Sequence, residues 1–245
     1  MALHGPRSLL LLNLLLGLST ACSGALDSPD NAGRRDLLFT FDDSTQAWTA
    51  SFTDVSAAQT SDVGFIFERR DGPAEAGTMG GALYLSGKNV SDDLFMFLTH
   101  PVSDLKPEAQ YSLTFELELA SNAPSGCAGI GGAPGESVFL KAGAASVLPE
   151  RVTTSTGAYR LNVDKGEQAT GGANAQVLGD IANGATDCNT PTYRRITRDN
   201  HGNSFRVSSD AQGQLWLLLG TDSGFEGTTS LYFDTIRVVL EPVQP

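Results

Sequence analysis

A strict alternation of apolar and polar residues marks the middle of the chain. In residues 111–119 (YSLTFELEL) every second residue is apolar, and the residues between them are Ser, Thr or Glu. A period of two sends neighbouring side chains to opposite faces of a β-strand, so this pattern predicts a strand that is buried on one face. No helical spacing fits the same residues.

Other segments predict further strands. Three short apolar runs bounded by Gly, Asp or Ser indicate strands that are buried on both faces, namely 63–67, 94–98 and 215–219. Strand-like patterns also occur at 38–41, 82–86, 138–142, 159–163, 204–207 and 230–240. Only 174–182 (NAQVLGDIA) permits a short helix, and Gly179 counts against it. With 27 Gly and 11 Pro to supply turns, the chain predicts an all-β fold, an antiparallel β-sandwich of jelly-roll type.

The N-terminus has the order of a secretory signal. Arg7 precedes an apolar stretch at 9–18, and small residues follow it. The stretch is shorter than the roughly 20 residues that a membrane-spanning helix needs. The following residues, 18–22 (LSTAC), resemble the lipobox of bacterial lipoproteins, although Leu is commoner at the position of Ser19. An ordinary cleaved signal peptide is the alternative, and both interpretations predict export.

The lipobox resemblance implies a location and a domain organisation. It implies cleavage before Cys22, a lipid on the Cys22 thiol and, because Ser23 and not Asp follows, the outer membrane of the cell envelope. We therefore predict a signal peptide at 1–21, a lipidated Cys and flexible tether at 22–36, and one β-sandwich domain at 37–245. A net charge of −12 argues against nucleic acid as a partner. The predicted contact with the membrane is made by the lipid alone.

Two cysteines remain after Cys22. Cys127 and Cys188 both lie among Gly, Ser, Asn and Thr, a composition typical of loops. An oxidising compartment favours a disulfide between them. Two unrelated buried thiols are the alternative.

Three acidic residues lie near the ends of the predicted domain. Asp234 shares the parity of Tyr232, Ile236, Val238 and Leu240, and Asp43, next to Asp42, continues the parity of Phe41. A carboxylate that faces the core is costly unless it is paired or bound to a cation. If the first and last strands are neighbours, these carboxylates can converge on a structural Ca²⁺. A solvated Asp234 at a bend is the alternative.

These two ends also carry a resemblance. Residues 39–43 (FTFDD) with Trp48, and 231–236 (LYFDTI), resemble the ends of jelly-roll carbohydrate-binding modules and galactose-binding-like domains. In those families the matching acidic positions often hold calcium, and the resemblance implies a glycan ligand. We expect aromatic rings to stack on sugars and loop acids to bind hydroxyl groups, and the candidate ligand-binding residues are Trp48, Tyr84, Asp222, Phe225 and Glu226.

An enzyme is the competing class. Glu116 and Glu118 stand two apart on one strand face, as the acid and nucleophile do in jelly-roll glycoside hydrolases. Their neighbours on that face are Ser112 and Thr114, so the row predicts a solvated outer surface instead. We predict a non-catalytic envelope lipoprotein that binds a glycan. The alternatives are a hydrolase or lyase using these residues or loop acids such as Asp92, Asp93 and Asp222, and an interaction lipoprotein without a small ligand.

Overall fold

The computed structural model describes residues 1–2, 33–77 and 80–244. The chain divides into two units, 1–32 and 33–245, and the second holds the fold. Cys22 and the predicted signal peptide lie outside the described residues. The first strand, β1, begins at Arg35, inside the segment predicted as a tether. No helix in the described ranges is long and apolar enough to cross a membrane.

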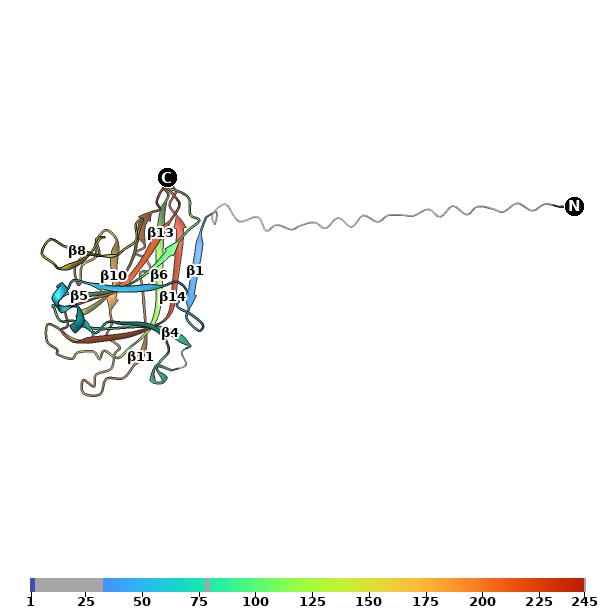
Figure 1. Cartoon of the computed structure of the whole chain (residues 1–245). Helices are drawn as coiled ribbons and strands as arrows, with labels where there is room; N and C mark the ends of the chain where they lie inside the picture. Colours follow the sequence, from blue (N-terminus) through green and yellow to red (C-terminus); the bar gives the residue numbers. More distant parts are fainter. Residues whose placement is uncertain (3–32, 78–79, 245) are drawn as a thin grey trace. The chain divides into compact units, whose positions relative to one another are not determined.

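Two antiparallel sheets build the fold (Figure 1). The seven-stranded sheet has the order β11 (Arg194–Asp199), β6 (Gln110–Ser121), β14 (Thr228–Pro242), β4 (Gly81–Lys88) and β3 (Ile66–Asp71), with β1 (Arg35–Thr40) paired to β14 and β12 (Phe205–Ser208) paired to β6. The five-stranded sheet has the order β10 (Ala175–Asp180), β7 (Val138–Ala145), β13 (Leu215–Ser223), β5 (Leu94–Val102) and β2 (Thr49–Thr53). A hairpin of β8 (Arg151–Thr153) and β9 (Tyr159–Leu161) and the 3₁₀ turns η2 (Ala57–Val63) and η3 (Ala74–Ala76) complete it. The predicted antiparallel sandwich is confirmed.

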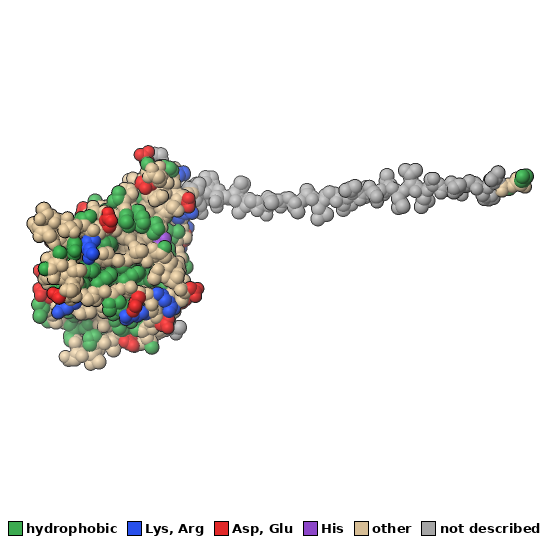
Figure 2. Space-filling model, viewed as in Figure 1, with side chains coloured by type: hydrophobic (Ala, Val, Ile, Leu, Met, Phe, Trp, Pro, Cys, Tyr) green, Lys and Arg blue, Asp and Glu red, His purple; other side chains and the backbone are tan. Residues whose placement is uncertain are grey.

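The core lies between the two sheets. The apolar residues of β6, from Tyr111 to Leu119, are buried in it, as their alternation predicts. Each large apolar side chain buried in this way contributes about 1.5–3 kcal/mol. Acidic and basic side chains are interspersed over the face of the domain shown in Figure 2.

A second, smaller core lies on the outer face of the five-stranded sheet. Residues 146–174, here called the cover segment, include β8 and β9, and Leu161 and Val163 of this segment pack against buried residues of that face. These buried residues include Phe95 and Phe97 of β5 and Leu218 of β13. The apolar runs at 94–98 and 215–219 are continuous because their strands are covered on both faces.

Several features differ from the expectations. The run 63–67, predicted as a strand buried on both faces, instead spans the end of η2 and the start of β3, a largely exposed edge strand. Residues 175–180, where a short helix was permitted, form the edge strand β10, with a bulge between Val177 and Gly179. A second bulge lies in β14, where Phe233 pairs with Leu119 and Thr235 pairs with Glu118, so that Asp234 is the extra residue. A bulge resets the alternation. The predicted core-facing direction of Asp234 is therefore wrong.

Candidate ligand site

The predicted calcium ligands lie just after β1 and on β14, and Asp42 and Asp234 already have other partners. β1 pairs with β14, as the calcium hypothesis requires. Asp42 Oδ1 accepts a hydrogen bond from the Gly81 amide at 3.0 Å, and Asp43 is exposed. Asp234 Oδ2 lies 3.2 Å from Arg195 Nη2. Burial raises the pKa of Asp234, and Arg195 acts in the opposite direction.

These three carboxylates do not make up a metal centre by themselves. Within the described ranges, no group of three or more His, Cys, Asp or Glu side chains is arranged to hold a metal ion. Calcium binding thus stays a prediction, which thermal melts with and without a chelator would test.

The structure also separates the five predicted ligand-binding residues. Trp48 is 1% exposed and packs against Phe39 and His100, so its ring cannot stack on a sugar. Asp222 is fully buried beneath the cover segment. Both assignments are corrected, because Trp48 belongs to the core and Asp222 to a buried ion pair. Tyr84 is also corrected, because it is only 9% exposed and the Arg70 guanidinium lies 3.8 Å from its ring centroid. Phe225 and Glu226 remain at the surface.

The predicted disulfide is confirmed and joins two loops. Cys127 and Cys188 are bonded, with their Cα atoms 5.7 Å apart. Cys127 lies in the loop between β6 and β7, and Cys188 lies in the loop between β10 and β11. Asn183 strengthens the same junction, because its side-chain amide donates to the carbonyls of Ser121 at 2.8 Å and Thr192 at 2.9 Å.

A pocket of about 300 Å³, here called the disulfide pocket, lies where these loops meet the turn between β13 and β14. Its lining is apolar with a few neutral polar groups: Asn122, Ala123, Pro124, Cys127, Ala128, Pro134, Ile181, Cys188, Pro191, Phe225, Thr228, Thr229 and Ser230. Apolar walls with a few polar groups are typical of small-molecule sites, and the volume is at the lower end of their range. The lining contains no acidic or basic side chain, so it offers no charged acid–base pair for catalysis.

Phe225 owes its place in the pocket to two glycines. A Cβ atom on Gly129 would lie 2.5 Å from the Phe225 ring, and one on Gly227 would lie 2.2 Å from it. Only glycine leaves room for the ring at these two positions. Phe225 is therefore half-buried and not freely displayed as predicted, and it lines the pocket wall. Glu226, next to it, is exposed and is not part of the lining.

Thr229 supplies an unpartnered hydroxyl group. Its side chain lines the pocket and is only 4% exposed, and its Oγ1 has no hydrogen-bond partner among the described residues. A buried polar group without a partner costs about 1–3 kcal/mol. Because Oγ1 is closed to solvent, a ligand hydroxyl would remove that cost once the side chain turns toward the pocket. Sequence reasoning missed Thr229, because nothing in the chain distinguishes it from other threonines.

A group of tyrosines on the outer face of the seven-stranded sheet lies next to the pocket. Ser230 lines the pocket and also accepts a hydrogen bond from Tyr84 Oη at 3.3 Å. The Tyr84 and Tyr232 rings lie 4.7 Å apart, and the Tyr193 ring meets that of Tyr232 edge-on at 5.2 Å. Burial raises the pKa of Tyr193 to about 12, so the Tyr193 hydroxyl stays protonated at physiological pH.

Glu116 and Glu118 lie in a separate groove on the same outer face. Glu116 Oε2 is 3.2 Å from Arg237 Nη1, and Glu116 Oε1 is 2.9 Å from His201 Nε2. Glu118 Oε2 is 3.3 Å from Arg195 Nη1. Both carboxylates are thus held in partly exposed ion pairs, on the solvated surface that their neighbours predicted.

Comparisons with known proteins give distant fold likenesses only. No family model matches the chain, and no curated protein matches it. One solved structure comes from a study of promiscuous carbohydrate-binding modules of the β-sandwich superfamily, and it is 12% identical with a TM-score of 0.38. The match covers 84% of this chain and 61% of the solved one.

Two further solved structures are similarly distant. A xylan-binding domain from Paenibacillus barcinonensis is 14% identical over 85% of this chain and 95% of its own, with a TM-score of 0.38. The cleaved adhesin domain of Lys-gingipain from Porphyromonas gingivalis is 13% identical over 83% of this chain and 97% of its own, with a TM-score of 0.36. Likenesses of this strength carry no argument about function.

Proposed function

We propose that this protein binds an uncharged glycan in the disulfide pocket and does not catalyse its cleavage. The observation that carries the proposal is the pocket lining, which joins the Phe225 ring and three prolines to the Thr229 and Ser230 hydroxyls without any charged side chain. A sugar ring has apolar C–H faces and a rim of hydroxyls, which match such walls. A uronic acid or sulfated sugar would lose its hydration there without gaining a counter-charge.

The size of the pocket favours one or two sugar residues, with the remainder of a chain running toward the partly exposed rings of Tyr193 and Tyr232. Partly exposed tyrosines offer rings for stacking and hydroxyls for hydrogen bonds. We further propose, from the lipobox resemblance, that a lipid on Cys22 attaches this binding domain to the cell envelope. Fatty-acid labelling of the wild type, lost in Cys22→Ala, is the expected result for that anchor.

The binding proposal is tested by titrating neutral and uronic-acid oligosaccharides of equal length into the protein and measuring the heat of binding. We expect binding to neutral oligosaccharides only. Thr229→Val removes the hydroxyl with little change in shape and should weaken binding about tenfold, the equivalent of one hydrogen bond.

Thr221→Val is the matched control, because Thr221 is also buried with an unpartnered hydroxyl but does not line the pocket. It should leave affinity unchanged. Absence of binding to every neutral oligosaccharide would refute the proposal. Release of sugar by the wild type that is abolished by Glu116→Gln would establish the enzyme alternative instead.

A further inference from the structure

The outer face of the five-stranded sheet carries a buried ion pair beneath the cover segment. Lys141 on β7 and Asp222 on β13 are both fully buried, with Lys141 Nζ 2.8 Å from Asp222 Oδ2. Lys141 Nζ also donates to the carbonyl oxygens of Lys165 and Thr170, each at 3.0 Å. Since Lys165 and Thr170 belong to the cover segment, this pair fastens that segment to the sheet.

The two oxygens of Asp222 are used unequally. Oδ2 accepts hydrogen bonds from Lys141 Nζ, from Lys165 Nζ at 2.8 Å and from the Gln168 amide at 3.0 Å. Oδ1 is buried, and no donor reaches it among the described residues. Asp93 also carries an unsatisfied acceptor, since its Oδ1 is buried and receives no hydrogen bond from the described part of the chain.

Strand register and parity place Asp222, and Asp93 immediately before β5, on one face of the sheet. Leu94 pairs with Ser223 and Phe95 with Asp222, so Asp93 stands diagonally across from Asp222. Diagonal neighbours in an antiparallel pair lie about 7–8 Å apart at Cα, within reach of two carboxyl groups that lean toward each other. One proton between them would satisfy both oxygens, as in other carboxyl pairs that share a site.

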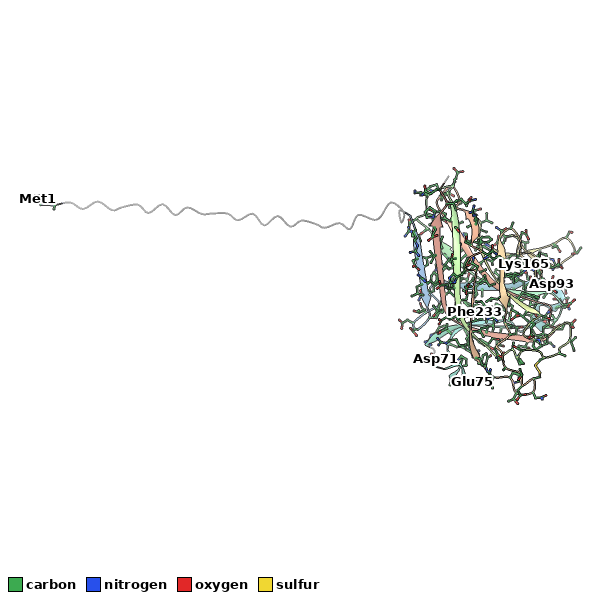
Figure 3. All side chains as sticks on the ribbon, turned by 180° about the vertical axis from the view of Figure 1, so that it is seen from behind. Met1, Asp71, Glu75, Asp93, Lys165 and Phe233 are labelled. Atoms are coloured by element: carbon green, nitrogen blue, oxygen red, sulfur yellow. A yellow bond between two sulfur atoms is a disulfide. The ribbon has the colours of Figure 1, made fainter. Side chains whose placement is uncertain are left out.

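We propose that Asp93 and Asp222 share one proton in the folded protein, and that this acid pair is a pH-sensitive latch for the cover segment. Asp93 lines an open pocket of about 280 Å³ at the margin of the cover segment, so water can exchange its proton. Lys165 lines the same pocket, and Figure 3 labels both residues on this side of the domain.

The charges around Asp93 explain why it keeps a proton. Burial raises the pKa of Asp93 to about 7, with Asp54 and Asp222 acting in the same direction and Lys165 and Arg160 opposing them. Both cations are already committed, Arg160 to Asp54 and Lys165 to Asp54 and Asp222. Asp164 and Glu167 add further negative charge to the pocket lining.

The sign of the pH effect follows from this raised pKa. When the cover segment opens, Asp93 returns to water and to an ordinary pKa near 3.9, so the closed state binds the proton more tightly. The stabilisation of the closed state is complete below about pH 4 and is lost as the pH rises through 7. Above that pH the ionised Asp93 repels Asp222. Because Lys165 and Gln168 of the cover segment bind Asp222, this repulsion weakens the attachment of the cover segment to the sheet.

The test is hydrogen exchange of the backbone amides of residues 165–170 in the wild-type protein, corrected for intrinsic exchange at each pH. Protection should fall about tenfold between pH 6 and pH 8, the ratio that a closed-state pKa of about 7 requires. Asp93→Asn replaces the shared proton with a permanent amide donor and should remove this pH dependence. The control Asp92→Asn, an exposed neighbour, should keep it.

Equal protection of the wild type at both pH values would overturn the latch, as would an undiminished tenfold change in Asp93→Asn. Carboxyl carbon NMR of the wild type gives a second readout that needs no variant. A resonance of Asp93 that titrates near pH 7, with that of Asp222 shifting in parallel, is the expected result. Titration of Asp93 near pH 4 would refute the shared proton even if the variant does not fold.

Discussion

At the scale of single residues, Lys141 and Asp222 form an ion pair in which both side chains are fully buried. A buried ion pair adds little net stability over an apolar pair of the same volume, but removal of one partner leaves the other charge buried. Burial lowers the pKa of Lys141, and contact with Asp222 opposes this shift. We therefore expect the pair to fix the position of the cover segment, because Lys141 binds two of its carbonyl groups. We expect it to add little to the free energy of unfolding relative to an apolar pair.

Asp222→Asn should lower the free energy of unfolding by about 3–5 kcal/mol, because Lys141 then stays buried without its counter-charge. Urea unfolding at fixed pH measures this change. Glu226→Gln, in the neighbouring turn but exposed, should change stability by less than about 0.5 kcal/mol. In the double variant Lys141→Met with Asp222→Leu, most of the loss should be recovered, and a loss equal to the sum of the single variants would contradict this account.

At the scale of elements, β14 depends on its bulge. Four residues around Asp234 face the core, namely Leu231 and Phe233 before it and Ile236 and Val238 after it. The two pairs have opposite parity in the sequence, because the bulge lies between them. The bulge lies where the neighbouring strand changes, since β4 pairs with β14 up to Phe233 and β1 pairs with it from Thr235 onward. The extra residue thus lets one strand serve two partners along the same edge.

Deletion of Asp234 should prevent folding or lower the melting temperature by more than 10 °C. Without the extra residue, Ile236 and Val238 must turn to the solvent or the pairing with β6 must slip. Asp234→Asn keeps the bulge and loses only the partly exposed contact with Arg195, so it should cost about 1 kcal/mol or less. Thermal melts followed by circular dichroism compare the two variants, and equal melting temperatures would contradict the role of the bulge.

The sequence predicted the inner strands well, because burial imposes its period on them. The alternation at 111–119 and the apolar runs at 94–98 and 215–219 all became strands of the sandwich. β11 was missed, because only Ile196 of its six residues is buried and an edge strand shows no alternation. The direction of Asp234 was wrong, because a one-residue bulge leaves no signature in the pattern.

The candidate site was harder to predict than the strands. The disulfide and the position of Phe225 among glycines gave usable signals, since both arise from local chemistry. The roles of Thr229 and Ser230 depend on three loops that are distant in sequence and meet only in the fold. Trp48 and Asp222 were misassigned, because nothing in the sequence marks residues 146–174 as a cover or Phe39 and His100 as neighbours of Trp48.

At the scale of the whole molecule, the disulfide joins two loops at one end of the sandwich and no strand depends on it directly. It closes a loop with a sequence separation of 61 residues. In the chain-entropy model such a bridge stabilises the fold by about 4 kcal/mol, mainly through the unfolded state. Its removal should therefore affect both global stability and the shape of the disulfide pocket.

The double variant Cys127→Ala with Cys188→Ala should lose about 4 kcal/mol of unfolding free energy and keep its β-sheet circular dichroism spectrum. Affinity for a neutral oligosaccharide should fall more strongly than in Thr229→Val, because two walls of the pocket lose their covalent link. Reduction of the wild type with a thiol provides an independent comparison. Unchanged affinity in the reduced protein would show that hydrogen bonds such as those of Asn183 suffice to hold the walls.

The order of the strands has a consequence for biosynthesis. β13 and β14 are the last two strands of the chain, yet β13 lies between β5 and β7, and β14 lies between β6 on one side and β1 and β4 on the other (Figure 1). A nascent chain that has not yet reached Leu215 contains the outer strands of both sheets. It lacks β13 and β14, the central strand of each sheet. Such a chain can already form outer pairs such as β3 with β4 and β7 with β10, but neither sheet can be completed until β13 and β14 have been made.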